Sequence, residues 1–392
     1  MTCSCDHDHN EPIKSLLEVE ELDLSGKNVE DLEILKETPN LRRLILRSCE
    51  IEDLSPLAGL TNLKELVLSG NNISDLSPLA GLKNLEQICA CSNRINDLSP
   101  LAELTNLNLI CIMDNEINDI SPLAKLTNMQ ELYISGNMLY SLSPLAELIN
   151  LQLLQIVDNE VSDITPLANL RNLKDLLIGN NVISDISPLV NLKNLQILDF
   201  TNNEVSDLSA LAELTNLKQL NMGSNAIFDI SPLASLVNLE NLCFCHNQID
   251  EIAPLARMIN LKSLCARSNR VSLLSPLAEL TNLEELKLCG NLITNLSPLA
   301  DLTNLQLLTL RRNGILDMIP LAELINLEAL DVAYCNALHN IPALYELINL
   351  KQFFYSEDTV SMGKALELSR CVPECELFPI KSNEDDSFGC DH

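Results

Sequence analysis

Residues 63–84 read LKELVLSGNNISDLSPLAGLKN, and residues 85–106 repeat the pattern as LEQICACSNRINDLSPLAELTN. The shift between them is 22 residues (85 − 63), and it holds over most of the chain. An Asn recurs in the same phase from Asn71 to Asn313, and a Pro column runs from Pro56 to Pro320 with one interruption, at Ala210. This period predicts a stack of about fifteen similar units.

The first part of each repeat predicts a short strand. In LKELVLSGN, Leu66 and Leu68 alternate with other residues, and side chains in a strand point alternately to its two faces. We therefore expect Leu66 and Leu68 to face the core. The outward positions are then Glu65, Val67 and Ser69.

The second part of the repeat predicts a turn and a short helix or 3-10 turn. Asn71 follows the strand, where its amide can donate to and accept from backbone groups that would otherwise be buried without partners. SPLAGL then predicts a helix start, with Ser77 as N-cap and Pro78 at the first helical position. Because one unit cannot bury its own leucine face, the units are expected to stack into an α/β solenoid with strands on the concave side.

Residues 51–85, IEDLSPLAGLTNLKELVLSGNNISDLSPLAGLKNL, resemble the internalin-type, SDS22-like class of leucine-rich repeats. The resemblance covers roughly residues 19 to 355. It implies a right-handed leucine-rich-repeat horseshoe with a concave parallel sheet, convex short helices or 3-10 turns, and protein recognition on the concave face. A phosphatase-regulatory SDS22-like subunit is one alternative, although these repeats carry SPLA where SDS22 proteins carry a Glu-rich turn.

The ends of the chain differ in composition from the repeats. We expect an acidic N-terminal tail leading into a cap at residues 1–18, the solenoid at 19–356, a C-terminal helical cap at 357–378 and a disordered acidic tail at 379–392. The first segment carries a weak metal-ligand pattern, with Cys3, Cys5, His7 and His9 at alternate positions. Structural zinc sites place two or more residues between paired ligands, so an acidic tail is the preferred interpretation.

Composition excludes several classes of function. The formal net charge is −30, which disfavours nucleic acid and anionic membranes as partners. The N-terminal residues lack the basic and apolar stretches of a secretory signal, and 14 cysteines then indicate reduced thiols in a cytoplasmic protein. There is no Gly-rich phosphate loop, HExxH or GxSxG motif, so we expect no enzyme and no cofactor.

The cysteines fall into two related triads. Cys89, Cys91 and Cys111 are expected on the outward face of neighbouring strands, and a second triad follows at an offset of 154 residues (243 − 89), which is seven repeats of 22. A duplicated seven-repeat block explains this recurrence without a function. Three interpretations remain open: small apolar surface residues, a soft-metal site, or redox-active thiols, the last two making the protein a metal or redox sensor. The second triad is Cys243, Cys245 and Cys265.

A basic group is predicted near the end of the repeats. Arg267, Lys287 and Arg311 share the outward strand face, where they are either solvated strand residues or a docking site for an acidic or phosphorylated protein segment. Cys289 lies in the same column as both arginines, which makes it the best candidate for a reactive thiol. The expected partner-binding residues on the concave face of this monomeric scaffold are Arg267, Lys287, Arg311, Tyr133, Asp199 and Asn221.

Overall fold

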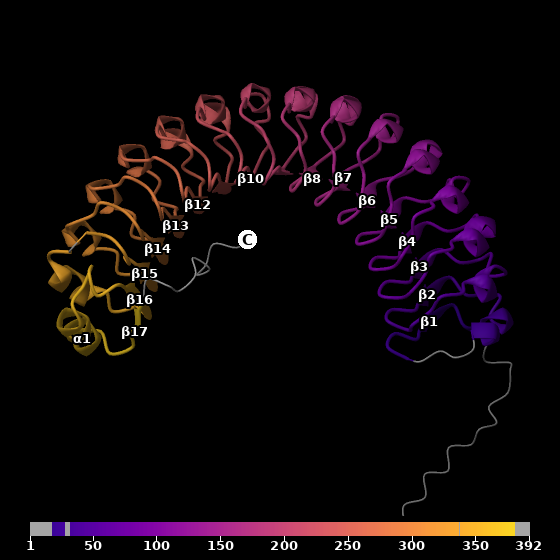
Figure 1. Cartoon of the computed structure of the whole chain (residues 1–392), viewed down its shortest axis with the longest axis horizontal. Helices are drawn as coiled ribbons and strands as arrows, with labels where there is room; N and C mark the ends of the chain where they lie inside the picture. The colour runs from indigo at the N-terminus through magenta and orange to yellow at the C-terminus, as the bar shows by residue number, and fades with distance from the viewer. Residues whose placement is uncertain (1–17, 28–31, 337, 381–392) are drawn as a thin grey trace, which may run out of the picture. The chain divides into compact units, whose positions relative to one another are not determined.

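The computed structural model describes residues 18–27, 32–336 and 338–380 (Figure 1). The chain divides into two compact units, Met1–Val182 and Ile183–His392, called unit 1 and unit 2 below. The N-terminal ligand-rich segment with Cys3, Cys5, His7 and His9 lies outside the described residues, as does nearly all of the predicted C-terminal tail. No helix among the described residues is long and apolar enough to cross a membrane.

Unit 1 alternates short strands with 3-10 helices. Its strands are β1 Glu21–Asp23, β2 Arg43–Ile45, β3 Glu65–Val67, β4 Gln87–Cys89, β5 Leu109–Cys111, β6 Glu131–Tyr133, β7 Leu153–Gln155 and β8 Asp175–Leu177. Its 3-10 helices are η2 Leu32–Glu37, η3 Ser55–Leu57, η4 Ser77–Gly81, η5 Ser99–Leu101, η6 Ser121–Lys125, η7 Ser143–Leu145 and η8 Thr165–Asn169.

Unit 2 continues the alternation and ends in an α-helix and a last strand. Its strands are β9 Ile197–Asp199, β10 Gln219–Asn221, β11 Asn241–Cys243, β12 Ser263–Cys265, β13 Glu285–Lys287, β14 Leu307–Thr309, β15 Ala329–Asp331, β16 Gln352–Tyr355 and β17 Glu376–Pro379. Its helices are η9 Ser187–Asn191, η10 Ser209–Leu211, η11 Ser231–Ser235, η12 Ala253–Arg257, η13 Ser275–Leu277, η14 Ser297–Leu299, η15 Ile319–Leu321, η16 Ile341–Glu346 and α1 Met362–Cys371.

Within each unit, successive strands pair in parallel, with a register equal to the repeat length. Leu66 pairs with Ile88, for example, and Cys243 pairs with Cys265, each 22 residues away. The register becomes 23 between β15 and β16, where Asp331 pairs with Phe354, because the sequence carries one extra residue there. In each unit the strands line the inner side of the stack and the 3-10 helices line the outer side (Figure 1). The predicted leucine-rich-repeat solenoid is thereby confirmed.

The core is a stack of leucine layers. Leu66 and Leu68 are fully buried, as the strand alternation predicted, and the equivalent positions of other repeats are buried as well. Larger side chains replace leucine in unit 2, where Phe200 and Phe244 are also fully buried. The repeat therefore fixes which side of each strand is available at the surface.

The asparagine ladder takes the form that the sequence predicts. Asn71 Nδ2 donates to the carbonyl oxygens of Leu46 and Leu68, both at 2.7 Å. Its Oδ1 accepts from the backbone amides of Cys49 and Ile51, at 2.9 and 3.1 Å. One buried side chain thus pairs backbone groups of two neighbouring repeats, which ties each repeat to the one before it.

The predicted Ser N-cap is wrong, and the preceding Asp takes that role. The 3-10 helix η4 begins at Ser77 without a side-chain cap, whereas Asp75 Oδ1 accepts the backbone amide of Ser77 at 2.7 Å. The same turn recurs at Asp53, and Asn295 makes it with a neutral side chain. The acidic column, which we expected to supply mainly solubility and dipole complementation, therefore also closes the turns that its Asp residues precede.

The C-terminal end of unit 2 combines a helix with a strand that the sequence did not predict. Within residues 357–378, α1 spans Met362–Cys371, and β17 then pairs in parallel with β16. Phe354 stacks on Phe378 with ring centroids 4.7 Å apart, and Tyr355 is fully buried. Pro379, which we placed in the disordered tail, belongs to β17.

Candidate functional site

The outward column of unit 2 holds most of the residues that the sequence singled out. It consists of the last residues of successive strands, and we call it the strand face of unit 2. A hollow of about 340 Å³ lies on it over β10 to β13, with Asn221, Cys243, Cys265, Glu285 and Lys287 among its lining residues. The strand face is formed by Asp199, Asn221, Cys243, Cys265, Lys287, Thr309 and Asp331.

Asp199 and Asn221, two predicted binding residues, lie in contact at one side of this hollow. Asn221 Nδ2 donates to Asp199 Oδ2 at 3.1 Å, and Asp199 Oδ1 accepts the backbone amide of Thr201 at 2.8 Å. Asn221 Oδ1 is buried, and no described residue donates to it. Thr309 Oγ1, in the same column, is also buried without a partner among the described residues.

The predicted basic group does not form three available charges. Arg311 is almost fully buried, and its Nε lies 3.0 Å from Asp331 Oδ2. Lys287 lines the hollow, and its Nζ lies 3.6 Å from Glu285 Oε2. Arg267 is half-buried and lies two residues beyond Cys265 in the chain. The sequence interpretation missed Asp331, although Asp331 is in the column of Asp199 at six repeats' distance (331 − 199 = 132).

Cys289, the predicted reactive thiol, is buried, with 8% of its surface exposed. That burial removes the accessibility that a reactive cysteine requires. The thiol favoured by the structure is Cys91, because a hydrogen bond with Cys111 lowers the pKa of Cys91 to about 7. Bonding with Cys89 and Cys91, together with burial, raises the pKa of Cys111. The Sγ atoms of Cys91 and Cys111 are 2.8 Å apart.

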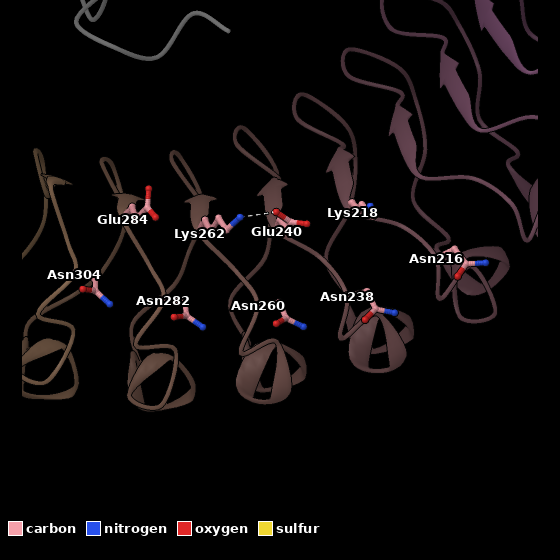
Figure 2. Close-up of a pocket in the computed structure, with 9 residues that line it drawn as sticks. All are labelled: Asn216, Lys218, Asn238, Glu240, Asn260, Lys262, Asn282, Glu284 and Asn304. Carbon is pink, nitrogen blue, oxygen red and sulfur yellow. Dashed lines mark hydrogen bonds and ion pairs between the residues drawn. The ribbon is translucent and has the colours of Figure 1, made fainter.

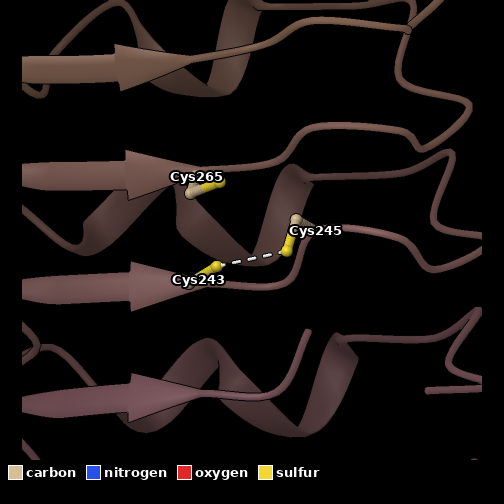
Figure 3. Close-up of side chains that lie close together, drawn as sticks. All are labelled: Cys243, Cys245 and Cys265. Carbon is tan, nitrogen blue, oxygen red and sulfur yellow. Dashed lines mark hydrogen bonds between the residues drawn. The ribbon is translucent and has the colours of Figure 1, made fainter. Parts of the chain in front are cut away.

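The second thiol triad is more compact. The Sγ atoms of Cys243 and Cys245 are 3.6 Å apart, and the three sulfurs of the triad all lie within 4.8 Å of one another (Figure 3). Among the residues that the structure describes, this is the only group of three or more Cys, His, Asp or Glu side chains placed to share a metal ion. His246, next in the sequence, is not part of it.

Tyr133 belongs to unit 1, at the end of β6. Its hydroxyl donates to Glu131 Oε2 at 2.8 Å. Burial and this hydrogen bond raise the pKa of Tyr133 to about 12, so the phenol is neutral at physiological pH. Tyr133 and Lys287 occupy equivalent positions of the two duplicated blocks (287 − 133 = 154), which makes them natural counterparts in a comparison of the two units.

A second hollow follows the start of the strands in unit 2. This asparagine groove has a volume of about 640 Å³, and Figure 2 shows a row of Asn side chains beside a row of alternating Lys and Glu. Lys262 Nζ lies 2.7 Å from Glu240 Oε2, and each Asn donates to the backbone of the previous repeat, as Asn260 does to Val237 O at 3.0 Å. Its lining residues are Asn216, Lys218, Asn238, Glu240, Asn260, Lys262, Asn282, Glu284 and Asn304.

Comparisons with known proteins agree with this architecture. The family model described as "Leucine Rich repeats (2 copies)" matches residues 39–81, 61–103, 171–213, 193–235 and 259–301. The crystal structure of an internalin, InlF, from Listeria monocytogenes is 34% identical, with a TM-score of 0.71 over 82% of this chain and 89% of that one. The chain belongs to the internalin-type leucine-rich-repeat proteins. No curated protein sequence gave a match.

Other solved structures extend the likeness of this internalin-type protein. A leucine-rich-repeat protein of Leptospira interrogans is 25% identical, with a TM-score of 0.76 over 91% of this chain and all of that one. A plant peptide hormone receptor, RGFR1, solved in complex with RGF2, is 21% identical and shares the fold, with a TM-score of 0.71 over 88% of this chain and 61% of that one.

The internalin-type repeat explains why the two hollows differ in the side chains that they present to a partner. The asparagine groove follows from a column that every repeat shares, and its amide donors are committed to backbone carbonyls. The strand face varies from repeat to repeat, since its residues are free of the packing demands on the leucines. Leucine-rich-repeat proteins are generally protein-interaction scaffolds without enzymatic activity, and a variable face is what recognition of one partner requires.

Proposed function

We propose that this internalin-type protein is a non-enzymatic scaffold or regulatory subunit that binds a partner protein on the strand face of unit 2. The observation that carries the proposal is Asn221 Oδ1, a buried acceptor at the hollow with no donor among the described residues. An unpaired buried acceptor costs about 1 to 3 kcal/mol, which a donor from a partner would recover. Asn221 lines the hollow over β10 to β13, and a rotation of its side chain would expose Oδ1 to a donor held there.

The chemistry of the hollow indicates a polar partner segment. Lys287 offers a cation beside the Glu285 carboxylate, and Asn221 offers an acceptor. The proposed partner therefore presents a donor for Asn221 and a carboxylate or phosphate for Lys287. The acidic or phosphorylated segment expected from sequence depends on Lys287 and Arg267 alone, since Asp331 neutralises Arg311. The monomeric state, the cytoplasmic location and the SDS22-like alternative stay predictions.

The test is a comparison of captured proteins between the wild-type chain and charge-reversal variants. Lys287→Glu and Asn221→Leu are expected to lose one specific partner. Lys125→Glu is the matched control, because Lys125 is an exposed cation in η6 on the outer side of unit 1. The partner identified in this way is then titrated against each purified variant, and Lys287→Glu is expected to weaken binding at least tenfold.

A variant of unit 1 separates this proposal from its closest competitor. Tyr133→Glu changes the position equivalent to Lys287 in the duplicated block. The last residues of the strands of unit 1, Tyr133 among them, form its equivalent strand face. If Tyr133→Glu abolishes partner binding while Lys287→Glu and Asn221→Leu retain it, the partner docks on that face of unit 1. A partner that binds all three variants with wild-type affinity excludes both strand faces and directs attention to the asparagine groove.

A further inference from the structure

The strand pairing of unit 2 brings the sulfur atoms of Cys243, Cys245 and Cys265 together on its strand face. Cys243 and Cys265 end β11 and β12 and pair in register, while Cys245 lies two residues beyond Cys243 and therefore on the same side of the chain. Phe244, between them, points into the core and is fully buried. Figure 3 shows the sulfurs of Cys243 and Cys245 directed toward each other beside Cys265.

The spacing of these sulfurs suits a metal ion. Thiolates that bind a metal at about 2.3 Å lie about 3.8 Å apart in a tetrahedral set and about 4.0 Å apart in a trigonal one. The triad has one separation of 3.6 Å and none above 4.8 Å. Shifts of the sulfur atoms of up to about 0.8 Å (4.8 − 4.0), which rotation of the side chains can supply, bring these distances to the trigonal value.

A glycine on the neighbouring strand end makes room for the third sulfur. A Cβ atom at Gly223 would lie 2.7 Å from Cys245 Sγ, so any larger residue there would push Cys245 out of the group. The corresponding residue of the first triad is Ser69 (223 − 154), whose side chain hydrogen-bonds Cys91. This difference accompanies the compact geometry of the second triad.

Positive charge and backbone donors lie close to the three thiols. Lys287 is the register partner of Cys265, and Arg267 lies two residues beyond Cys265 in the chain. The backbone amides of Cys245 and Arg267 hydrogen-bond Cys243 and Cys265. Cys243 and Cys265 also line the hollow, which gives an ion a path from solvent.

We propose that Cys243, Cys245 and Cys265 form a three-thiolate site for a soft metal cation, with Cu(I) as the ion of best fit. Soft thiolates select Cu(I) and Zn(II), but Zn(II) sites are almost always completed by a fourth ligand. Three thiolates complete a trigonal Cu(I) site, and no fourth Cys, His, Asp or Glu belongs to this group among the described residues. On binding, three S–H bonds break, three Cu–S bonds form and three protons leave to solvent. The metal site shares this hollow with the proposed docking surface, but its test contains no partner protein and therefore does not rest on the proposed function.

Proton release gives the site a distinctive pH dependence. Hydrogen bonding with Cys245 and burial raise the pKa of Cys243 to about 12, and bonding with Cys243 and burial do the same for Cys265. Bonding with Cys243 lowers the pKa of Cys245, but bonding with Cys265 and burial outweigh it and raise that pKa to about 12. Since binding displaces a proton from each thiol, the apparent affinity for Cu(I) is expected to rise with pH.

The experiment is an anaerobic Cu(I) titration of the full chain against a chromophoric Cu(I) chelator. All proteins carry Cys3→Ser and Cys5→Ser, which removes the N-terminal thiols as competing ligands. The test variant replaces Cys243, Cys245 and Cys265 by Ser. The matched control replaces Cys89, Cys91 and Cys111 by Ser, which changes the same residue types at equivalent positions of the other block.

The parent protein carries only Cys3→Ser and Cys5→Ser. We expect the parent and the control to retain one Cu(I) and the test variant to lose it. The X-ray absorption spectrum of the bound Cu(I) is expected to show three sulfur neighbours. Cys245→Ser alone, checked by circular dichroism, serves as the test if the triple variant does not fold. A parent that yields all its Cu(I) to the chelator overturns the proposal. So does a test variant that retains as much as the control, or a spectrum with two sulfur neighbours.

Discussion

Arg311 Nε lies 3.0 Å from Asp331 Oδ2, and the two side chains are among the most buried charged groups of unit 2. Asp331 also accepts the backbone amide of Ala333 at 3.0 Å, so both of its oxygens have partners. Burial raises the pKa of Asp331 despite the neighbouring arginine. The pair is therefore a structural element of the strand face and leaves Arg311 unable to receive an acidic ligand.

Breaking this pair is expected to destabilise the protein strongly. Asp331→Ala leaves the Arg311 charge buried without its partner, and losses of about 3 to 5 kcal/mol are typical of such changes. The double variant Arg311→Met with Asp331→Leu removes both charges and is expected to recover most of the loss. Urea unfolding followed by circular dichroism measures both. A single variant within about 0.5 kcal/mol of wild type would show that water reaches the pair.

The acidic column makes stability depend on pH. Hydrogen bonds from the Ser55 hydroxyl and amide hold the pKa of Asp53 below its usual 3.8, and those from Ser99 do the same for Asp97. A lowered folded pKa gives stability that is present above pH 3.8 and lost as the pH falls through the folded value. We expect the thermal midpoint to fall in this range.

Substitution by Asn isolates that effect. Asn295 already makes the same turn without a charge, so Asp53→Asn and Asp97→Asn are expected to keep the hydrogen bond. In these variants the thermal midpoint should fall less steeply at low pH than in the wild type. Asp53→Ala and Asp97→Ala are expected to lower the midpoint at neutral pH as well. Equal acid sensitivity of the Asn variants and the wild type would assign the titration to other groups.

Alkylating agents are expected to modify Cys91 faster than the buried Cys289. With its pKa lowered to about 7, the rate of modification should rise with a midpoint near that pH. Cys111→Ala removes the hydrogen bond that lowers the pKa and should move the midpoint upward. Mass spectrometry of peptides after short exposure to iodoacetamide measures each site, with buried Cys289 as the slow reference. Faster modification of Cys289 than of Cys91 contradicts this assignment.

The two asparagine columns should differ in their effect on stability. Asn269 is buried, accepts from Ile249 N and donates to Phe244 O, so Asn269→Ala leaves backbone groups unpaired. The expected loss is about 1 kcal/mol or more for each unpaired group. Asn282 is exposed and makes one bond to Ile259 O, so water can replace its amide in Asn282→Ala. Denaturant unfolding of both variants compares them, and losses of equal size would contradict the ladder's role.

The fold was predictable from sequence because one structural pattern recurs throughout. Leu66, Leu68 and Asn71 each have a single packing or hydrogen-bonding role, and repetition makes those roles visible. Strand β17 could not be predicted in the same way, since residues 376–379 have no counterpart in other repeats and depend on packing of Phe378 against Phe354.

The candidate site was predictable only in part. Alternation placed Cys243, Cys265 and Lys287 on one face, and the structure gathers them around one hollow. Alternation alone cannot reveal that Asp331 neutralises Arg311, or that Gly223 leaves space for the sulfur of Cys245. Those relations depend on the direction and length of side chains on neighbouring strands, and an alignment of the repeats gives neither.

Strand β17 also decides where growth of the sheet stops. The end of a parallel stack presents unpaired amides and carbonyls to which another chain could add a strand. β17 covers that edge of β16, and its last residue, Pro379, has no amide hydrogen to offer a newcomer. With Pro379 at its end, the open side of β17 offers one backbone donor fewer to a further strand, which disfavours addition of another chain at this edge.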